Sequence, residues 1–167
     1  RLADVYKIYY SKSVVEEENE NLKMNGKLKL LNMDGDSVLA ENIFTHKMLV
    51  FRYTIMNCSD CINAEFELLS KEFINKIDIT VNICFLAYYE NTRDLVVDFR
   101  RFQEKQLNIN MFILPINRLQ IPIESQNLPY YFTIDSSLIM RDFFIPIKEK
   151  PNWTYSYFER LKKNYFK

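Results

Sequence analysis

Two cysteines separated by two residues, Cys58 and Cys61, lie where a strand pattern changes into a helix pattern. Residues 47–54 are apolar on both faces, as in a buried parallel strand. Residues 59–73 carry apolar side chains at helical spacing. A thiol in the first turn of a helix meets unpaired N–H groups and the positive end of the helix dipole, and both lower its pKa. The pair therefore indicates thiol redox chemistry, with a metal site or a structural staple as alternatives.

A metal site is the weaker of these interpretations because further ligands are scarce. The chain has three cysteines and one histidine in 167 residues. Zinc would need Cys84 and His46 besides the pair, and neither stands at a ligand spacing. Cys84 lies in an apolar run and is predicted to be a buried core thiol. We therefore predict no metal and no cofactor.

The order of the remaining patterns predicts a mixed α/β sheet flanked by helices. A hairpin is expected first, because an Asp-Gly turn signal at 34–35 separates two short strand patterns. Strand and helix patterns then alternate, which favours parallel central strands. The expected elements are strands at 47–54, 77–87 and 111–114, helices at 59–73 and 91–106, a closing hairpin over 130–144 and a C-terminal helix after Pro151.

The N-terminal segment is predicted to lie outside the compact domain. Residues 1–15 have apolar and aromatic side chains at roughly helical spacing, and residues 16–20 form an acidic run. We interpret the acidic run as a solvated linker. The chain is accordingly divided into a helical arm or linker, 1–20, and a compact domain, 21–167.

Charge and hydropathy restrict the partners. Lys plus Arg equal Asp plus Glu at 22 each, so no net field would draw the chain to nucleic acid. The apolar runs are much shorter than the roughly 20 residues of a membrane span, and we expect no span in this chain. Because the sequence begins at Arg1, we expect any signal peptide or lipid anchor to lie upstream.

Three segments resemble the thioredoxin fold, and within it the extracytoplasmic TlpA/ResA-like thiol-disulfide oxidoreductases and the related AhpC/TSA group. The Cys-Ser-Asp-Cys motif at 58–61 follows a buried strand and opens a helix. The Leu-Pro pair at 128–129 precedes a strand pattern and is similar to the cis-proline segment of thioredoxins. The hairpin around 34–35 is similar to the entry hairpin of the subgroup. The resemblance spans about residues 26–166, and parts of it are similar to cell-envelope members from Bacteroides-type bacteria.

This resemblance implies a mechanism and a substrate surface. Cys58 would attack a substrate disulfide, and Cys61 would resolve the mixed disulfide. A cis peptide between Leu128 and Pro129 would leave the backbone of Leu128 free to pair with an extended substrate segment. The implied partners are protein disulfide substrates and an upstream thiol-disulfide electron donor. The implied location is the bacterial periplasm or cell envelope.

Several residues depart from the usual thioredoxin pattern. Asn57 stands where a Trp is common, and Ser59 and Asp60 replace Gly-Pro. The position three residues after the second cysteine, a Glu in many ResA-like proteins, is Ala64, and Glu65 comes one position later. We therefore assign Glu65 no proton-relay role and expect a narrow or specialised reductant.

Three residues are candidate modulators of the pair: Asp60, Arg52 and Asn57. The Asp60 carboxylate would disfavour a nearby thiolate, which favours a reducing couple. Arg52 places a charge in a predicted central strand, where it needs a partner. It either reaches a carboxylate at the strand end or supports the Cys58 thiolate, and we favour the first.

The sequence as a whole predicts a thiol-disulfide oxidoreductase acting as a reductase. The competing hypothesis is a thioredoxin-like binding or accessory module of the cell envelope, in which the thiols are incidental. A peroxiredoxin is less well supported, because Phe51 and Ile55 occupy the positions of its Pro and its Thr or Ser.

Overall fold

A computed structural model describes residues 2–69, 82–104, 109–115 and 119–165. Its strands are β1 (Lys29–Leu31), β2 (Ser37–Leu39), β3 (Met48–Thr54), β4 (Asn82–Tyr88), β5 (Asn110–Ile113), β6 (Tyr130–Ile134) and β7 (Arg141–Phe144). Its helices are α1 (Leu2–Asn19), α2 (Ala40–Ile43), α3 (Ser59–Leu68), α5 (Thr92–Glu104), the 3-10 helix η2 (Pro122–Gln126) and α6 (Pro151–Tyr165).

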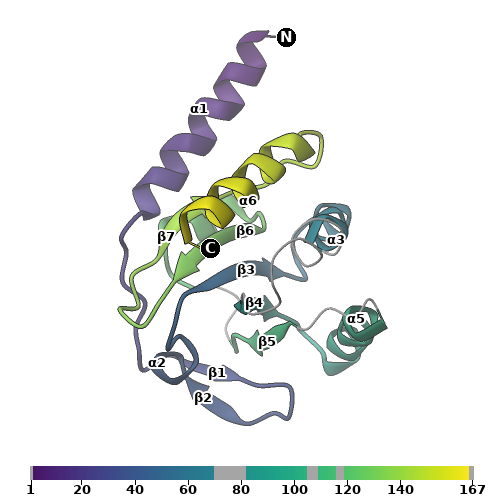
Figure 1. Ribbon diagram of the computed structural model, residues 1–167. Coiled ribbons are helices and arrows are strands. Elements are labelled where there is room, and N and C mark those ends of the chain that lie inside the picture. The colour runs from purple at the N-terminus through teal and green to yellow at the C-terminus, as the bar shows by residue number, and fades with distance from the viewer. Residues whose placement is uncertain (1, 70–81, 105–108, 116–118, 166–167) are drawn as a thin grey trace.

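The described strands form a seven-stranded mixed sheet in the order β2-β1-β5-β4-β3-β6-β7 (Figure 1). The centre is parallel, since β3 pairs with β4 and β4 with β5 in the same direction. The N-terminal hairpin of β1 and β2 extends one side, and β6 and β7 extend the other with antiparallel pairs. The predicted mixed α/β fold with an N-terminal hairpin is confirmed.

Strand β3 lies between β4 and β6 and leads into the turn that contains Cys58. All seven of its residues are buried, which explains its apolar character on both faces. Leu49, Phe51 and Tyr53 belong to one core cluster, whereas Met48 and Val50 belong to the other. The alternation of side chains along a strand produces this division.

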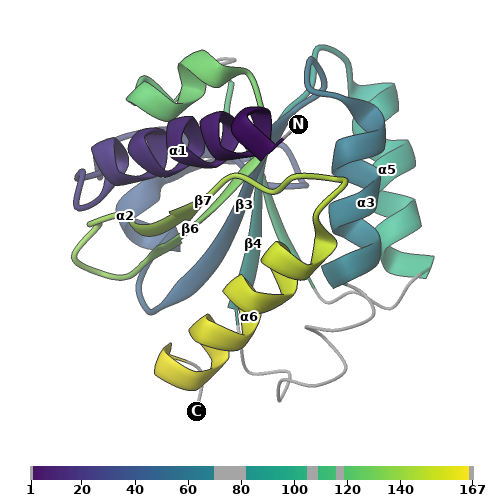
Figure 2. The same cartoon turned by 90° about the horizontal axis from the view of Figure 1, so that it is seen from above.

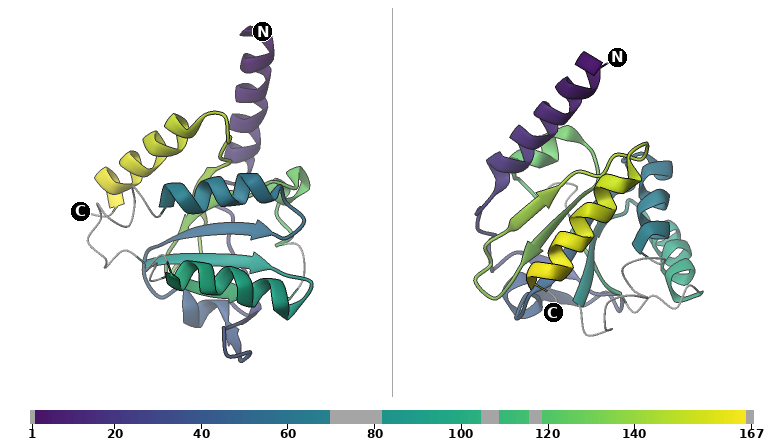
Figure 3. Two further views of the ribbon diagram at one scale, coloured as in Figure 1. Left: turned by 90° about the vertical axis from the view of Figure 1, so that its right-hand side faces the viewer. Right: turned by 45° about the horizontal axis from the view of Figure 1, so that its top comes forward.

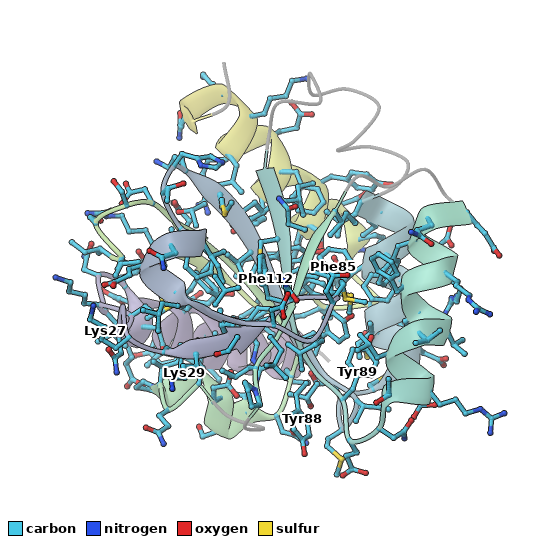
Figure 4. The ribbon with its side chains drawn as sticks, turned by 90° about the horizontal axis from the view of Figure 1, so that it is seen from below. Lys27, Lys29, Phe85, Tyr88, Tyr89 and Phe112 are labelled. Carbon is cyan, nitrogen blue, oxygen red and sulfur yellow. The ribbon has the colours of Figure 1, made fainter. Side chains whose placement is uncertain are left out.

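Helices α3, α5 and α6 cover one face of the sheet, and α2 and η2 lie on the other (Figures 2 and 3). The first face is aromatic: Phe66 of α3 packs between Phe51, Phe85 and Phe102, with ring centroids 4.5 to 5.9 Å away. Figure 4 labels Phe85 on β4 and Phe112 on β5, which pack on opposite faces. The helix that begins at the cysteines is therefore fixed by its own core contacts.

The acidic run is not a solvated linker, and that prediction is wrong. Helix α1 continues to Asn19, and its glutamates reach β7 at the edge of the sheet. Glu20 accepts hydrogen bonds from the backbone N–H groups of Asp142 and Phe143, at 3.1 and 2.8 Å. Glu16 accepts one from Ile145 at 2.8 Å. These carboxylates satisfy donors that no further strand pairs, which holds the run in place. The division at residue 20 stays a prediction.

Other expected boundaries shift by a few residues. The helix predicted at 59–73 and the strand predicted at 77–87 partly fall on residues 70–81, outside the described part. The second strand of the hairpin expected over 130–144 begins only at Arg141, because Leu138 has a positive φ of 60° that breaks the extended pattern. No helix among the described residues is long and apolar enough to cross a membrane.

Candidate active site

The turn between β3 and α3 is held by the side chain of Asn57. Its Oδ1 accepts a hydrogen bond from the N–H of Thr54 at 2.8 Å. Its Nδ2 donates to the backbone oxygen of Asn127 at 2.9 Å, in the segment that leads to β6. Asn57 is buried. Asn57, which stands where a Trp is common, thus ties the turn before Cys58 to the loop at Asn127. It can affect the thiols only by holding this turn in position.

Cys58 is the N-cap of α3, and its thiol is exposed. The Sγ atom accepts a hydrogen bond from the backbone N–H of Cys61 at 3.3 Å. Hydrogen bonds from the Cys61 thiol and N–H lower the pKa of Cys58, and the backbone of Asp60 adds to this. The unpaired backbone N–H groups at the start of a helix point toward a sulfur at this position, and they stabilise a negative charge on it.

Cys61 lies one turn into the same helix and is half-buried. Burial, followed by the hydrogen bond to and the charge of the neighbouring Cys58 sulfur, raises its pKa to about 11. The two thiols therefore differ strongly in acidity. One is exposed and ionises readily, whereas the other is sheltered and keeps its proton.

The carboxylate of Asp60 forms an ion pair with Lys148, with 3.4 Å between Nζ and Oδ2. Asp60 raises the pKa of Cys58, but this is the smallest of the influences on that thiol. Asp60 together with the two thiols raises the pKa of Lys148. Lys148 comes from the loop between β7 and α6, and the sequence pattern did not single it out. The two prolines that flank it, Pro146 and Pro151, indicate only that Lys148 lies in a loop.

Arg52 forms a buried ion pair with Glu124 of η2, with 3.0 Å between Nε and Oε1. Its guanidinium also donates to the backbone oxygens of Tyr53 and Leu86. Glu124 accepts a further hydrogen bond from the hydroxyl of Tyr130 at 2.6 Å. Arg52 is not among the groups that shift the pKa of Cys58. This geometry agrees with the expectation that Arg52 pairs with a carboxylate and does not support the Cys58 thiolate.

The peptide between Leu128 and Pro129 is trans, as are all peptide bonds between described residues. The expected cis-proline is therefore wrong for this structure. Two residues earlier, Asn127 ends η2 with a left-handed φ of 52°. Pro129 is buried, whereas the Leu128 side chain is 43% exposed. Of these two residues, Leu128 alone has an exposed side chain.

Glu65 is the buried acid of α3, one turn beyond Cys61 on the same side of the helix. It accepts a hydrogen bond from the hydroxyl of Tyr131 at 2.8 Å. Burial raises its pKa to about 7. The sequence drew attention to Glu65 only as a displaced family residue. Its burial follows from the tertiary packing of α3 on β6.

The third cysteine and the histidine lie apart from the pair. Cys84 is fully buried in β4, where burial raises its pKa to about 12. His46 lies in the loop before β3 and forms a hydrogen bond with Thr45. Among the described residues, no three His, Cys, Asp or Glu side chains come close enough together to hold a metal ion.

The sheet order and the thiol pair at the start of α3 define a thioredoxin-like fold, and comparison with solved structures agrees. A thiol:disulfide interchange protein from Bacteroides sp. matches with a TM-score of 0.54 and 14% identity, over 87% of this chain and 94% of that one. A secreted disulfide oxidoreductase from Mycobacterium tuberculosis matches with a TM-score of 0.54 and 11% identity, over 81% and 96%.

A thioredoxin-like protein from Porphyromonas gingivalis matches with a TM-score of 0.53 and 13% identity, over 88% of this chain and 97% of that one. No protein-family profile and no curated protein sequence matches the chain. The similarity lies in the fold, at identities where sequence comparison alone finds no relative.

Proposed function

We propose that the protein is a thiol-disulfide oxidoreductase that reduces disulfides in other proteins. The observation that carries the proposal is the difference between the two thiols: Cys58 is exposed with a lowered pKa, and Cys61 is half-buried with a raised one. An attacking thiol must be ionised and accessible, whereas a resolving thiol works best when it waits in its protonated form.

The proposed reaction transfers two electrons from the cysteine pair to the substrate. The Cys58 thiolate attacks one sulfur of the substrate disulfide, and the other substrate sulfur leaves as a thiolate that takes up a proton. Cys61 then loses its proton and attacks Sγ of Cys58. This forms the Cys58–Cys61 disulfide and releases the second substrate sulfur as a thiol. An upstream dithiol donor restores the pair by the reverse exchange, and no cofactor takes part.

The substrate would approach over Cys58 and Leu128. Both side chains are exposed, and they belong to neighbouring segments because Asn57 is hydrogen-bonded to Asn127. With a trans bond before Pro129, substrate contact rests on the exposed Leu128 side chain. Residues Asp60 and Lys148 form a charge pair beside the thiols and would tune the couple.

The proposed setting is the bacterial periplasm or cell envelope, with any lipid or signal anchor upstream of Arg1. The support is the similarity to a secreted disulfide oxidoreductase and to a thiol:disulfide interchange protein, together with the resemblance of the motif itself. The second candidate is a thioredoxin-like binding or accessory module without redox turnover. The non-standard residues between and before the cysteines, Ser59, Asp60 and Asn57, favour that alternative.

Reduction of insulin disulfides in the presence of dithiothreitol separates the two functions. We expect turnover by the wild-type protein and its loss, by about 100-fold or more, in Cys58→Ser, because the nucleophile is removed. In a separate reaction without dithiothreitol, pre-reduced Cys61→Ser should trap a mixed disulfide that a non-reducing gel reveals. The matched control is Cys84→Ala, whose buried thiol takes no part and which should keep the wild-type rate. Equal background rates for the wild type and Cys58→Ser would support the binding module instead.

A further inference from the structure

A groove of about 440 Å³ begins at Cys61 and runs between the loop after β7 and helix α1. This size falls within the range of ligand pockets, roughly 300–1,000 Å³. Its apolar wall is formed by Val15, Leu128, Ile145, Pro146 and Ile147. The groove is continuous with the resolving thiol, so a chain held in it lies beside the sulfur that completes the exchange.

Helix α1 supplies one wall of the groove. Ser11, Lys12 and Val15 line the groove from successive turns of this helix. The C-terminal end of α1 lies beside β7, and its N-terminal turns project beyond the sheet (Figures 1 and 3). Glu16 and Glu20 bind this end to β7 and to Ile145 just after it. Near its end, the side chain of Asn19 accepts a hydrogen bond from the N–H of Ile123 in η2. The wall is thus fixed to the domain at both the sheet edge and the opposite loop.

Both lysines at the groove are already paired within the protein, and Glu149 is the third charged residue of its lining. Lys12 forms an ion pair with Glu16 at 2.5 Å, and its ammonium lies 4.1 Å from the ring centre of Phe144. Lys148 is paired with Asp60. An acidic side chain entering the groove would lose water and find both lysines engaged, whereas an apolar side chain gains from burial against the five apolar residues of the wall. The chemistry of the groove therefore selects an apolar occupant.

We propose that α1 forms one wall of a substrate groove, which takes an extended segment of the substrate protein with a large apolar side chain beside its disulfide cysteine. This inference rests on the proposed reductase function and adds the class of disulfide that the site prefers. Residues upstream of the compact domain would then take part in specificity, although they lie outside the segment that resembles thioredoxins.

The test uses two synthetic peptide disulfides that differ only in the residue beside the cysteine, Leu in one and Ser in the other. Single-turnover reduction by the reduced wild-type protein should favour the Leu peptide by about tenfold, the usual scale of discrimination in an apolar pocket. Val15→Ser and Ser11→Trp should each bring the ratio of the two rates close to one. Val15→Ser removes an apolar contact, and Ser11→Trp fills the groove from an exposed position that tolerates the change.

The control is Val97→Ser on α5, a valine that is 52% exposed and does not line the groove; it should keep the wild-type ratio. A wild-type ratio near one, or wild-type ratios in both α1 variants, would overturn the groove assignment while leaving the reductase in place. Failure of the wild type to reduce both peptides and a small aromatic disulfide reagent would instead refute the underlying function.

Discussion

Cys61 provides the two strongest stabilising contacts to the Cys58 sulfur, one from its thiol and one from its backbone N–H. The backbone contact survives any substitution, whereas the thiol contact depends on the side chain. The pKa of Cys58, the proposed nucleophile, therefore depends partly on the side chain at position 61. This arrangement also explains why Cys61 holds its proton, since it donates to the sulfur that carries the charge.

A substitution at Cys61 should consequently change the pKa of Cys58. In Cys61→Ala the side-chain donor is lost, and we expect the pKa of Cys58 to rise toward that of an ordinary thiol. In Cys61→Ser a hydroxyl donor remains, so the rise should be smaller. The pH dependence of alkylation by iodoacetamide measures both. An alkylation profile unchanged between the wild type and Cys61→Ala would contradict this account.

Glu65 should make stability depend on pH. Its folded pKa of about 7 lies above the ordinary value of 4.5, so the protonated form is the one the fold favours. Its contribution is fully present below pH 4.5 and is lost as the pH rises through about 7. The amount is roughly 3 kcal/mol at most, since one pKa unit corresponds to about 1.4 kcal/mol.

Glu65→Gln should therefore lose less stability than the wild type between pH 5 and pH 8, because it has no proton to release. Urea unfolding at the two pH values measures the difference. Glu18→Gln is the matched control, since Glu18 lies exposed on α1 and should follow the wild type. If Glu65→Gln also follows the wild type, burial of Glu65 does not govern its ionisation.

At the scale of elements, helix α1 acts as a cover for the β7 edge. An edge strand otherwise presents unpaired N–H and C=O groups to solvent and to other chains. Here Glu20 accepts hydrogen bonds from two of these N–H groups, and Glu16 accepts one from Ile145, the residue after β7. The cover uses side chains in place of a further strand, so it closes the edge without extending the sheet.

Removal of these carboxylates should destabilise the protein. We expect Glu20→Ala, which loses two charge-assisted hydrogen bonds, to lower the free energy of unfolding by about 1–3 kcal/mol. Glu16→Ala should cost less, since it loses one such bond. Glu18→Ala should stay within about 0.5 kcal/mol of the wild type. Denaturant titration checks the series, and identical midpoints for Glu20→Ala and Glu18→Ala would refute the role of α1 as a cover.

Features encoded in contiguous residues could be predicted, and features formed by distant residues could not. The apolar run of β3 and the spacing in α3 place Cys58 at a helix start because strand and helix periods are local properties. The pairing of Asp60 with Lys148 joins distant segments of the chain. The acidic run was misjudged for the same reason, because its hydrogen-bond donors lie in β7. The cis bond expected before Pro129 came from the resemblance and not from the residues around it, and the structure has a trans bond there.

At the scale of the whole molecule, the balance between reduced and oxidised states follows from the environment of both thiols. Hydrogen bonds favour the Cys58 thiolate and so stabilise the reduced form. Burial disfavours ionisation of Cys61, and Asp60 opposes the Cys58 thiolate while its charge is paired with Lys148. We expect a potential in the range of reductases and isomerases, at or below about −180 mV, and not near the roughly −120 mV of the strongest oxidants.

Titration against glutathione buffers measures this potential. Asp60→Asn removes the negative charge and leaves Lys148 unpaired beside the thiols, so both changes favour the thiolate. We expect the potential to rise, on the order of 10–20 mV for so exposed a group. Asp34→Asn, in the turn of the N-terminal hairpin, should leave it unchanged. A lower potential in Asp60→Asn would show that the sign assigned to Asp60 is wrong.

The place of β3 in the sheet has a consequence for how activity relates to folding. Phe51 lies opposite Phe85 on one side and Tyr131 on the other, so β3 is completed only by strands from distant parts of the chain. Such pairings form slowly, because closing long loops costs entropy before any contact is gained. A short peptide containing both cysteines would have ordinary thiols. The rate at which Cys58 reacts with a thiol reagent during refolding should therefore rise as β3 pairs with its neighbours and α3 forms.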